Sequence, residues 1–373
     1  MNRSRNVCLV SLVVVLAAIV SSPAWGGTTY TAIDLNPSGF TSCYGYGIGG
    51  TQQAGYGYGS ATSNNVHALL WSGSAASDVD LNPSGFTSSY ACWTDGSQQV
   101  GWGSGSATGG SEHALLWSGS STGYVDLNPS GFASSHAEGV SGTQQVGRGV
   151  TTSGGTRALL WNGSAADYVN LNPTGFTYSD ALSTDGTKQA GVGYGSATGG
   201  NYHALLWSGS ATGYVDLNPS GFTTTYAEGI GGTQQVGLGT GSATGGSWHA
   251  LLWSGTAASY IDLNPDGFTA SYAYATNGTE QVGNGLGSAT GGYSHALLWD
   301  GSADRYIDLQ QFLPTNFYKS FASAIDANGD IIGYARDTSG NYHAVLWEPI
   351  PEPATLALLA VGGMALLRKR RGA

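Results

Sequence analysis

The chain repeats itself seven times, and this fixed period constrains its fold more than any local motif. The Trp that ends the segment HALLW, or a variant of it, recurs at intervals of 44 to 48 residues. These tryptophans are Trp71, Trp117, Trp161, Trp207, Trp253, Trp299 and Trp347. A second landmark, DLNP or a variant, starts at Asp34, Asp80, Asp126, Asn170, Asp216, Asp262 and Asp308. Each unit of about 46 residues is therefore one structural module that packs against its neighbours.

Within one unit, turn residues separate four short segments that have strand composition. In the fifth unit these segments are residues 225–230, 234–239, 249–253 and 260–263. The first two flank Gly231-Gly232, and other units carry Asp-Gly or Asn-Gly there, which are dipeptides that accept the positive φ of tight hairpins. Pro and Gly in NPDG end the fourth segment. The pattern predicts a four-stranded antiparallel blade.

The order of the segments predicts how the blades are joined. The chain enters the repeats on a fourth segment, residues 30–35, and leaves them on a third segment, residues 343–347. If the first strand completes the last blade, no sheet edge stays open. We therefore expect an all-β, seven-bladed β-propeller closed by the N-terminal strand, in preference to a linear solenoid, which needs no such complementarity.

The composition supports a folded, turn-rich β protein. Only 9% of the 373 residues are charged and 61 are Gly, but 11% are aromatic, so a core can form. The net charge is −11, and only six basic residues lie between the two termini. Nucleic-acid binding is not expected, because it needs clustered Lys and Arg.

The N-terminus has the layout of a secretory signal peptide. Arg3 and Arg5 precede an apolar run over residues 7–20 and a small-residue stretch over residues 21–26. We expect a signal peptide at 1–26, a propeller at 27–349 and a C-terminal tail at 350–373. Export permits a disulfide between Cys43 and Cys92, but two cysteines in neighbouring units form no disulfide framework.

The C-terminal tail combines three features in a fixed order: a PEP segment, an apolar stretch over residues 356–367, and a basic end. It resembles the PEP-CTERM sorting signal. The residues that carry the resemblance are Pro351, Glu352, Pro353, Ala354, Thr355, Arg368, Lys369, Arg370 and Arg371. The resemblance implies an exosortase-type processing enzyme as partner and the surface or matrix of a Gram-negative-type bacterium as destination. The apolar stretch with its basic stop predicts transient anchoring in the inner membrane.

The repeats themselves resemble the bacterial extracellular HAF repeat family. The resemblance rests on HALLW followed by DLN, on DANGDIIGYA at 326–335 and on YHAVLW at 342–347. The chain has Leu or Val in place of the family's Phe, and Arg157 replaces one His. The family implies an exported repeat protein and supplies no activity.

Two repeated patterns are candidates for metal binding. Six equivalent histidines recur, but they belong to third segments of separate units, so a hydrogen bond to a neighbouring strand or turn is the preferred interpretation. Asp262, Asn264 and Asp266 match the start of a calcium loop, yet Ala273 stands where the bidentate acid belongs. We expect no metal and no cofactor, and keep these three residues as a calcium candidate.

Aromatic side chains that vary between units are the candidates for ligand binding, because variable positions on a rigid scaffold serve recognition. The candidates are Trp93, Trp102, Tyr202, Trp248 and Tyr293. The regular Trp of HALLW is instead expected to pack between blades.

No nucleophile motif or acid–base set interrupts the repeat, so no catalytic residue is expected. Glu138 and Glu228 share one repeat position and keep a hydrolase or lyase possible. The leading hypothesis is a non-enzymatic surface or matrix protein that binds or scaffolds extracellular polysaccharide. The alternative is a propeller enzyme that acts on such a polysaccharide.

Overall fold

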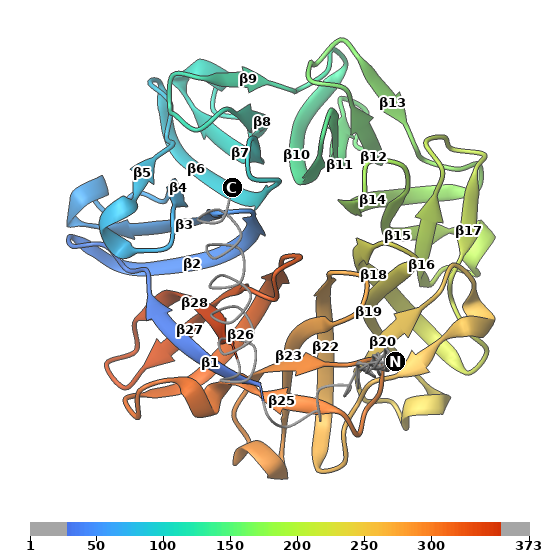
Figure 1. The fold of residues 1–373 in the computed structure, drawn as a ribbon. Coiled ribbons are helices and arrows are strands. Elements are labelled where there is room, and N and C mark those ends of the chain that lie inside the picture. Colours follow the sequence, from blue (N-terminus) through green and yellow to red (C-terminus); the bar gives the residue numbers. More distant parts are fainter. Residues whose placement is uncertain (1–27, 352–373) are drawn as a thin grey trace, which may run out of the picture.

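The computed structural model describes residues 28–351, and these form seven four-stranded antiparallel sheets arranged in a ring (Figure 1). The predicted seven-bladed β-propeller is confirmed. The predicted signal peptide, and the sorting tail from residue 352 onward, lie outside the described residues.

Each blade has one strand nearest the axis and three further strands outward from it (Figure 1). The innermost strands of blades 1 to 7 are β2 (Phe40–Gly49), β6 (Phe86–Thr94), β10 (Phe132–Ser141), β14 (Phe176–Thr184), β18 (Phe222–Gly231), β22 (Phe268–Thr276) and β26 (Phe317–Ile325). The second strands are β3 (Gln52–Gly59), β7 (Gln99–Gly105), β11 (Gln144–Thr151), β15 (Gln189–Gly195), β19 (Gln234–Gly241), β23 (Gln281–Gly287) and β27 (Ile331–Asp337). The third strands are β4 (His67–Trp71), β8 (His113–Trp117), β12 (Thr156–Trp161), β16 (Tyr202–Trp207), β20 (His249–Trp253), β24 (His295–Trp299) and β28 (Tyr342–Ile350). The outermost strands are β5 (Val79–Asp80), β9 (Tyr124–Asp126), β13 (Tyr168–Asn170), β17 (Tyr214–Asp216), β21 (Ile261–Asp262), β25 (Tyr306–Asp308) and β1 (Thr29–Asp34).

The observed strands follow the predicted segments closely, with one addition. The loop between the second and third strands, SATGG or a variant, contains a short 3₁₀ helix in five blades, which the sequence pattern did not predict. In blade 5 the Thr244 hydroxyl donates to the Ser247 carbonyl at 2.6 Å and so closes the turn. The 3₁₀ helices are η1 (Ser60–Thr62), η2 (Ala75–Ser77), η3 (Ser106–Thr108), η4 (Ser196–Thr198), η5 (Ser242–Thr244), η6 (Ala257–Ser259), η7 (Ser288–Thr290) and η8 (Leu309–Phe312).

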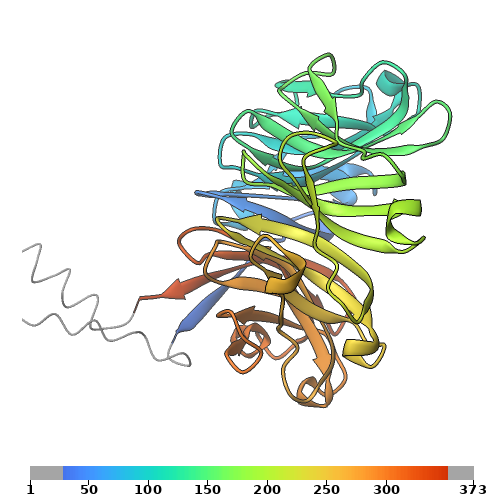
Figure 2. The ribbon, with the colours of Figure 1, turned by 90° about the vertical axis from the view of Figure 1, so that its right-hand side faces the viewer.

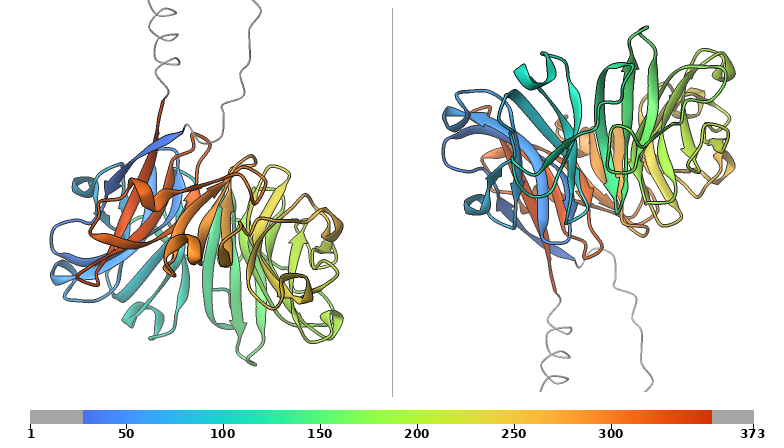
Figure 3. Two further views of the ribbon diagram at one scale, coloured as in Figure 1. Left: turned by 90° about the horizontal axis from the view of Figure 1, so that it is seen from below. Right: turned by 90° about the horizontal axis from the view of Figure 1, so that it is seen from above.

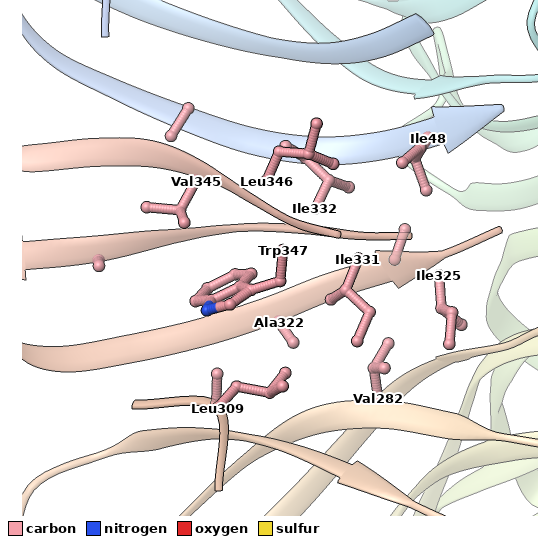
Figure 4. Close-up of a cluster of buried hydrophobic side chains, with 14 of the residues drawn as sticks. Ile48, Val282, Leu309, Ala322, Ile325, Ile331, Ile332, Val345, Leu346 and Trp347 are labelled. Atoms are coloured by element: carbon pink, nitrogen blue, oxygen red, sulfur yellow. The ribbon is translucent and has the colours of Figure 1, made fainter. Parts of the chain in front are cut away.

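The repeated tryptophans form the core between blades. All seven HALLW-type tryptophans are fully buried. Trp253 of blade 5 packs with Leu206 and Leu217 of blade 4, and the same arrangement recurs around the ring. Figure 4 shows Trp347 above Leu309, the residue that follows the outermost strand of blade 6. The Trp of each repeat therefore joins its own blade to the preceding one.

The N-terminal strand closes the ring, as predicted. β1 pairs antiparallel with β28, from Thr29 opposite Ile350 to Asp34 opposite Val345. Asp34 also accepts a 2.7 Å hydrogen bond from His343, and Leu35 is fully buried. Because these paired strand ends lie together, the described chain begins and ends on one face of the propeller (Figures 2 and 3).

Candidate functional site

A β-bulge in every innermost strand turns one side chain toward the propeller axis. The pairing of the first two strands skips two residues of the innermost strand in all seven blades, one next to its first residue and one further along. The second skipped residues are Tyr46, Cys92, Glu138, Leu182, Glu228, Tyr274 and Ser323. All seven line one central cavity. The bulge thus converts seven equivalent sequence positions into one site.

A glycine of the second strand makes room for each bulge. A Cβ at Gly237 would run into the carbonyl oxygen of Tyr226, two residues before the bulged Glu228. The same close backbone approach occurs at Gly55, Gly101, Gly147, Gly191, Gly283 and Gly333. Only a hydrogen atom fits there, which explains why the glycine of the QxG pattern, or of IIG in the last blade, recurs in each unit.

The central cavity has a volume of about 400 Å³, within the range of small-molecule sites. Five further side chains complete its wall: Tyr56, Trp93, Trp102, Phe321 and Tyr334. Seven of the twelve lining residues are aromatic and two are carboxylic acids. A wall of this kind offers flat apolar faces together with a few strong hydrogen-bond acceptors.

The aromatic rings are held in place by one another. Tyr46 stacks on Tyr56 at 5.3 Å between ring centroids, and their hydroxyl groups lie 3.2 Å apart. Phe321 stacks on Tyr334 at 4.8 Å. Trp102 stacks on the His136 ring at 4.2 Å with nearly parallel planes. A ligand that enters therefore meets a preformed aromatic surface.

Arg148 organises the charged groups on the blade 3 and blade 4 side of the cavity. Its Nη1 donates to Asp180 at 2.7 Å and to Glu138 at 3.0 Å. Its Nη2 lies 2.8 Å from Nδ1 of His136, and because a guanidinium only donates, this Nδ1 is the acceptor. Nε2 of His136 then carries the proton and donates to Glu112 at 2.7 Å. Burial, followed by the Arg148 charge, lowers the pKa of His136, in agreement with this neutral tautomer.

The two cavity carboxyl groups differ in their partners. Burial raises the pKa of Glu138 to about 7; the Asp180 charge adds to this effect and Arg148 opposes it. Burial, with a further contribution from Asp180, likewise raises the pKa of Glu228 to about 7. Within residues 28–351 Glu228 has no hydrogen-bond donor or cation beside it. Both groups are thus poised to change charge near neutral pH.

The structure brings two of the five predicted ligand-binding residues into the cavity, Trp93 and Trp102. Tyr202 instead packs on Tyr226 of the next blade, and Trp248 also contacts Tyr226. Tyr293 is 48% exposed and lies against Tyr318.

Sequence reasoning did not single out the cavity residues Tyr274, Phe321 and Tyr334 as ligand contacts. One sequence feature could have identified most of the wall. The repeat position that carries the bulge varies in residue type between units, whereas the rest of the innermost strand is similar in all of them.

The six repeated histidines form hydrogen bonds to neighbouring strands, as preferred from the sequence. In each blade except blade 3, where Arg157 replaces His, Nδ1 of the histidine lies 2.7 Å from a carboxylate oxygen of the outermost strand. The partners are Asp80, Asp126, Asp216, Asp262, Asp308 and Asp34.

Two of the three calcium-candidate residues, Asp262 and Asn264, have side-chain oxygens engaged within the protein, and Asp266 is exposed. Asp262 contacts His249 and accepts from the Asn264 backbone at 2.9 Å. The Asn264 side-chain oxygen accepts from Ser271 at 2.7 Å. Among residues 28–351, no three His, Cys, Asp or Glu side chains are placed to hold a metal ion. Cys43, buried in blade 1, and Cys92, at the cavity, are both free thiols.

Comparison with known proteins identifies the C-terminal tail. Residues 349–371 match the model of the PEP-CTERM protein-sorting motif. The chain carries a PEP-CTERM sorting signal. The PEP-CTERM motif indicates an exported protein of the cell envelope or surface. It covers only the end of the chain, so it says nothing about the propeller. A search of curated proteins finds no match to the chain. Within residues 28–351, no helix has the length and apolar character needed to cross a membrane.

Solved structures similar to the propeller of this PEP-CTERM chain share its fold at low sequence identity. The β-propeller domain of the trilobed protease from Pyrococcus furiosus is 7% identical, with a TM-score of 0.54, over 83% of this chain and 97% of that domain. That domain is described as having an open velcro topology, whereas β1 and β28 pair in this chain. A puromycin hydrolase is 12% identical, with a TM-score of 0.56, over 84% of this chain and 52% of the hydrolase. The chain therefore spans about half of that enzyme, and at such identities the likeness shows the fold alone.

Proposed function

We propose that this protein is an exported, non-catalytic propeller of the HAF repeat type that binds extracellular polysaccharide in its axial cavity. In this proposal an exosortase-type enzyme processes the PEP-CTERM tail and releases the propeller to the surface or matrix of a Gram-negative-type bacterium. The observation that carries the binding function is the preformed aromatic wall with two carboxyl groups. Sugar rings stack on aromatic faces, and carboxylates accept hydrogen bonds from sugar hydroxyls.

A glycan array probed with the full chain in non-ionic detergent tests the binding function. We expect binding of at least one oligosaccharide without release of new reducing ends. Trp102→Ala removes a cavity wall and should weaken binding at least tenfold. Trp248→Ala is the matched control, because it removes the same side chain outside the cavity and should leave binding unchanged. Equal affinity of wild type and Trp102→Ala for every bound glycan would refute the axial site.

A second candidate function is glycoside cleavage, and the presence of Glu138 and Glu228 in one cavity favours it. A carboxyl group with a pKa near 7 can act as a general acid at neutral pH. Reducing-end release from a bound glycan that disappears in both Glu138→Gln and Glu228→Gln would support this candidate and overturn the non-catalytic one.

A further inference from the structure

The cavity offers negative charge without a free positive counterpart. Glu138 and Glu228 are its two charged lining groups, and within the described chain no Lys or Arg lines it. Arg148 contacts the lining residue Glu138 and also contacts Asp180. Arg148 carries one positive charge, whereas Asp180, Glu138 and Glu228 are three acidic groups. The cluster therefore has more acidic than basic groups.

The aromatic wall has the same electrostatic preference. The faces of Tyr and Trp rings carry partial negative charge and attract cations within about 6 Å of the ring centroid. Tyr46, Tyr56, Trp102, Tyr274 and Tyr334 all contribute to the wall. Ring faces and carboxylates therefore both favour a cation in this cavity, where partial burial strengthens each interaction.

We propose that the axial cavity selects a sugar unit that bears a free, protonated amino group. This inference rests on the proposed function and specifies its ligand class. The ammonium group lies between Glu228 and the aromatic faces, and the sugar ring stacks on the wall. A uronic acid is rejected because its carboxylate would meet two like charges. An N-acetylated sugar keeps the stacking but loses the charge.

A metal ion is a poorer fit to the same residues. Hard cations take six or more oxygen ligands, whereas the lining supplies two carboxyl groups among seven aromatic rings. Aromatic cages with few acids are the arrangement that recognises organic ammonium groups.

Isothermal titration of the full chain with three trisaccharides tests the inference at pH 7.5, where carboxyl groups with a pKa of about 7 are mostly ionised. The probes are a glucosamine trimer, an N-acetylglucosamine trimer and a galacturonic acid trimer. We expect the glucosamine trimer to bind at least tenfold more tightly than the N-acetylated trimer, and the uronic acid trimer not to bind. Glu228→Gln should remove most of the difference between the first two probes. Glu280→Gln, a carboxyl change in the β22–β23 turn outside the cavity, should preserve it.

The outcomes separate this inference from the proposed function. Equal or tighter binding of the N-acetylated or the uronic acid trimer, weakened by Trp102→Ala, would overturn the ammonium selection and leave the glycan site standing. Spermidine binding as tightly as the glucosamine trimer would overturn the assignment to a sugar. Failure of every saccharide, including those of the glycan array, would overturn both proposals.

Discussion

At the residue scale, the seven repeated tryptophans pack through apolar contacts of their rings, without a hydrogen bond from the indole N–H to any described residue. Among residues 28–351 their buried indole N–H groups have no protein hydrogen-bond partner. Each Trp therefore contributes apolar area and volume, and its buried polar atom opposes this contribution.

Replacement of Trp347 separates these two effects. We expect Trp347→Ala to lower the free energy of unfolding by about 3–5 kcal/mol, because it leaves a cavity between blades 7 and 6. Trp347→Phe should cost about 2 kcal/mol or less, since it retains most of the ring and removes the unpaired donor. Chemical denaturation measures both values. A Phe variant as unstable as the Ala variant would mean that the indole N–H has a partner, such as a buried water.

The cavity acids make stability depend on pH in a direction that can be derived. The folded protein holds the Glu228 proton up to a pKa of about 7, against an ordinary value of 4.5. Between these two values the folded state binds more protons than the unfolded state, so the Glu228 contribution to stability falls as pH rises through this window.

Glu228→Gln removes this penalty. The variant should be more stable than wild type at pH 8, by at most about 3 kcal/mol, and the two should converge near pH 4.5. Thermal melts from pH 4.5 to 8 provide the measurement. A variant that is less stable than wild type at pH 8 would indicate a buried cation beside Glu228.

At the element scale, the glycine of the second strand and the bulge of the innermost strand depend on one another. Without the close approach at Gly237 the bulge could not form, and Glu228 would leave the axis. A regular strand in its place would shift the later residues to the opposite face of the blade.

Gly237→Ala tests this dependence. The added methyl group would meet backbone, which cannot move aside as a flexible side chain can, so we expect a loss of about 2–4 kcal/mol of stability. Gly213→Ala is the control, because its methyl group would meet only the Ser210 hydroxyl and the edge of Ser208. Equal denaturation midpoints for the two variants would contradict the role assigned to Gly237.

Pairing of β1 with β28 is the second element-scale feature that can be tested. Deletion of residues 28–35 removes six residue pairs and the buried Leu35, and exposes the edge of β28. We expect a sharply lower melting temperature and aggregation. A chain that lacks only residues 1–27 is the control and should melt like the mature protein. Unchanged melting after the longer deletion would show that closure contributes little to stability.

At the scale of the whole molecule, the two ends of the described chain leave one face of the ring together (Figures 2 and 3). The PEP-CTERM motif begins at residue 349, within the last strand. Pro351 is exposed directly after β28, so a processing enzyme can reach this residue without unfolding a blade.

Processing of the tail is therefore predicted to separate an intact propeller from its anchor. Intact-mass measurement of surface-extracted protein should give a mass that lacks Arg368 to Arg371. Changing Pro351, Glu352 and Pro353 to Ala should retain the full-length chain in the inner membrane. A surface protein whose mass still includes Ala373 would contradict processing.

The sequence alone determined the architecture, because the number of repeats sets the number of blades and the order of their segments sets how the ring closes. Seven units with four strand segments each predict seven blades, and the segment order at the two ends predicts closure by β1. The sorting motif could also be predicted from the sequence, since its three features follow one another directly in the chain.

Tertiary structure alone decided which residues form the cavity. Tyr46, Glu138, Glu228 and Tyr274 lie far apart in the chain, and they line one cavity because each innermost strand carries a bulge at the equivalent position. The fold likewise separated Trp102, which lines the cavity, from Trp248, which packs on Tyr226 of its own blade, because the position of a side chain depends on strand register and on which strand carries it.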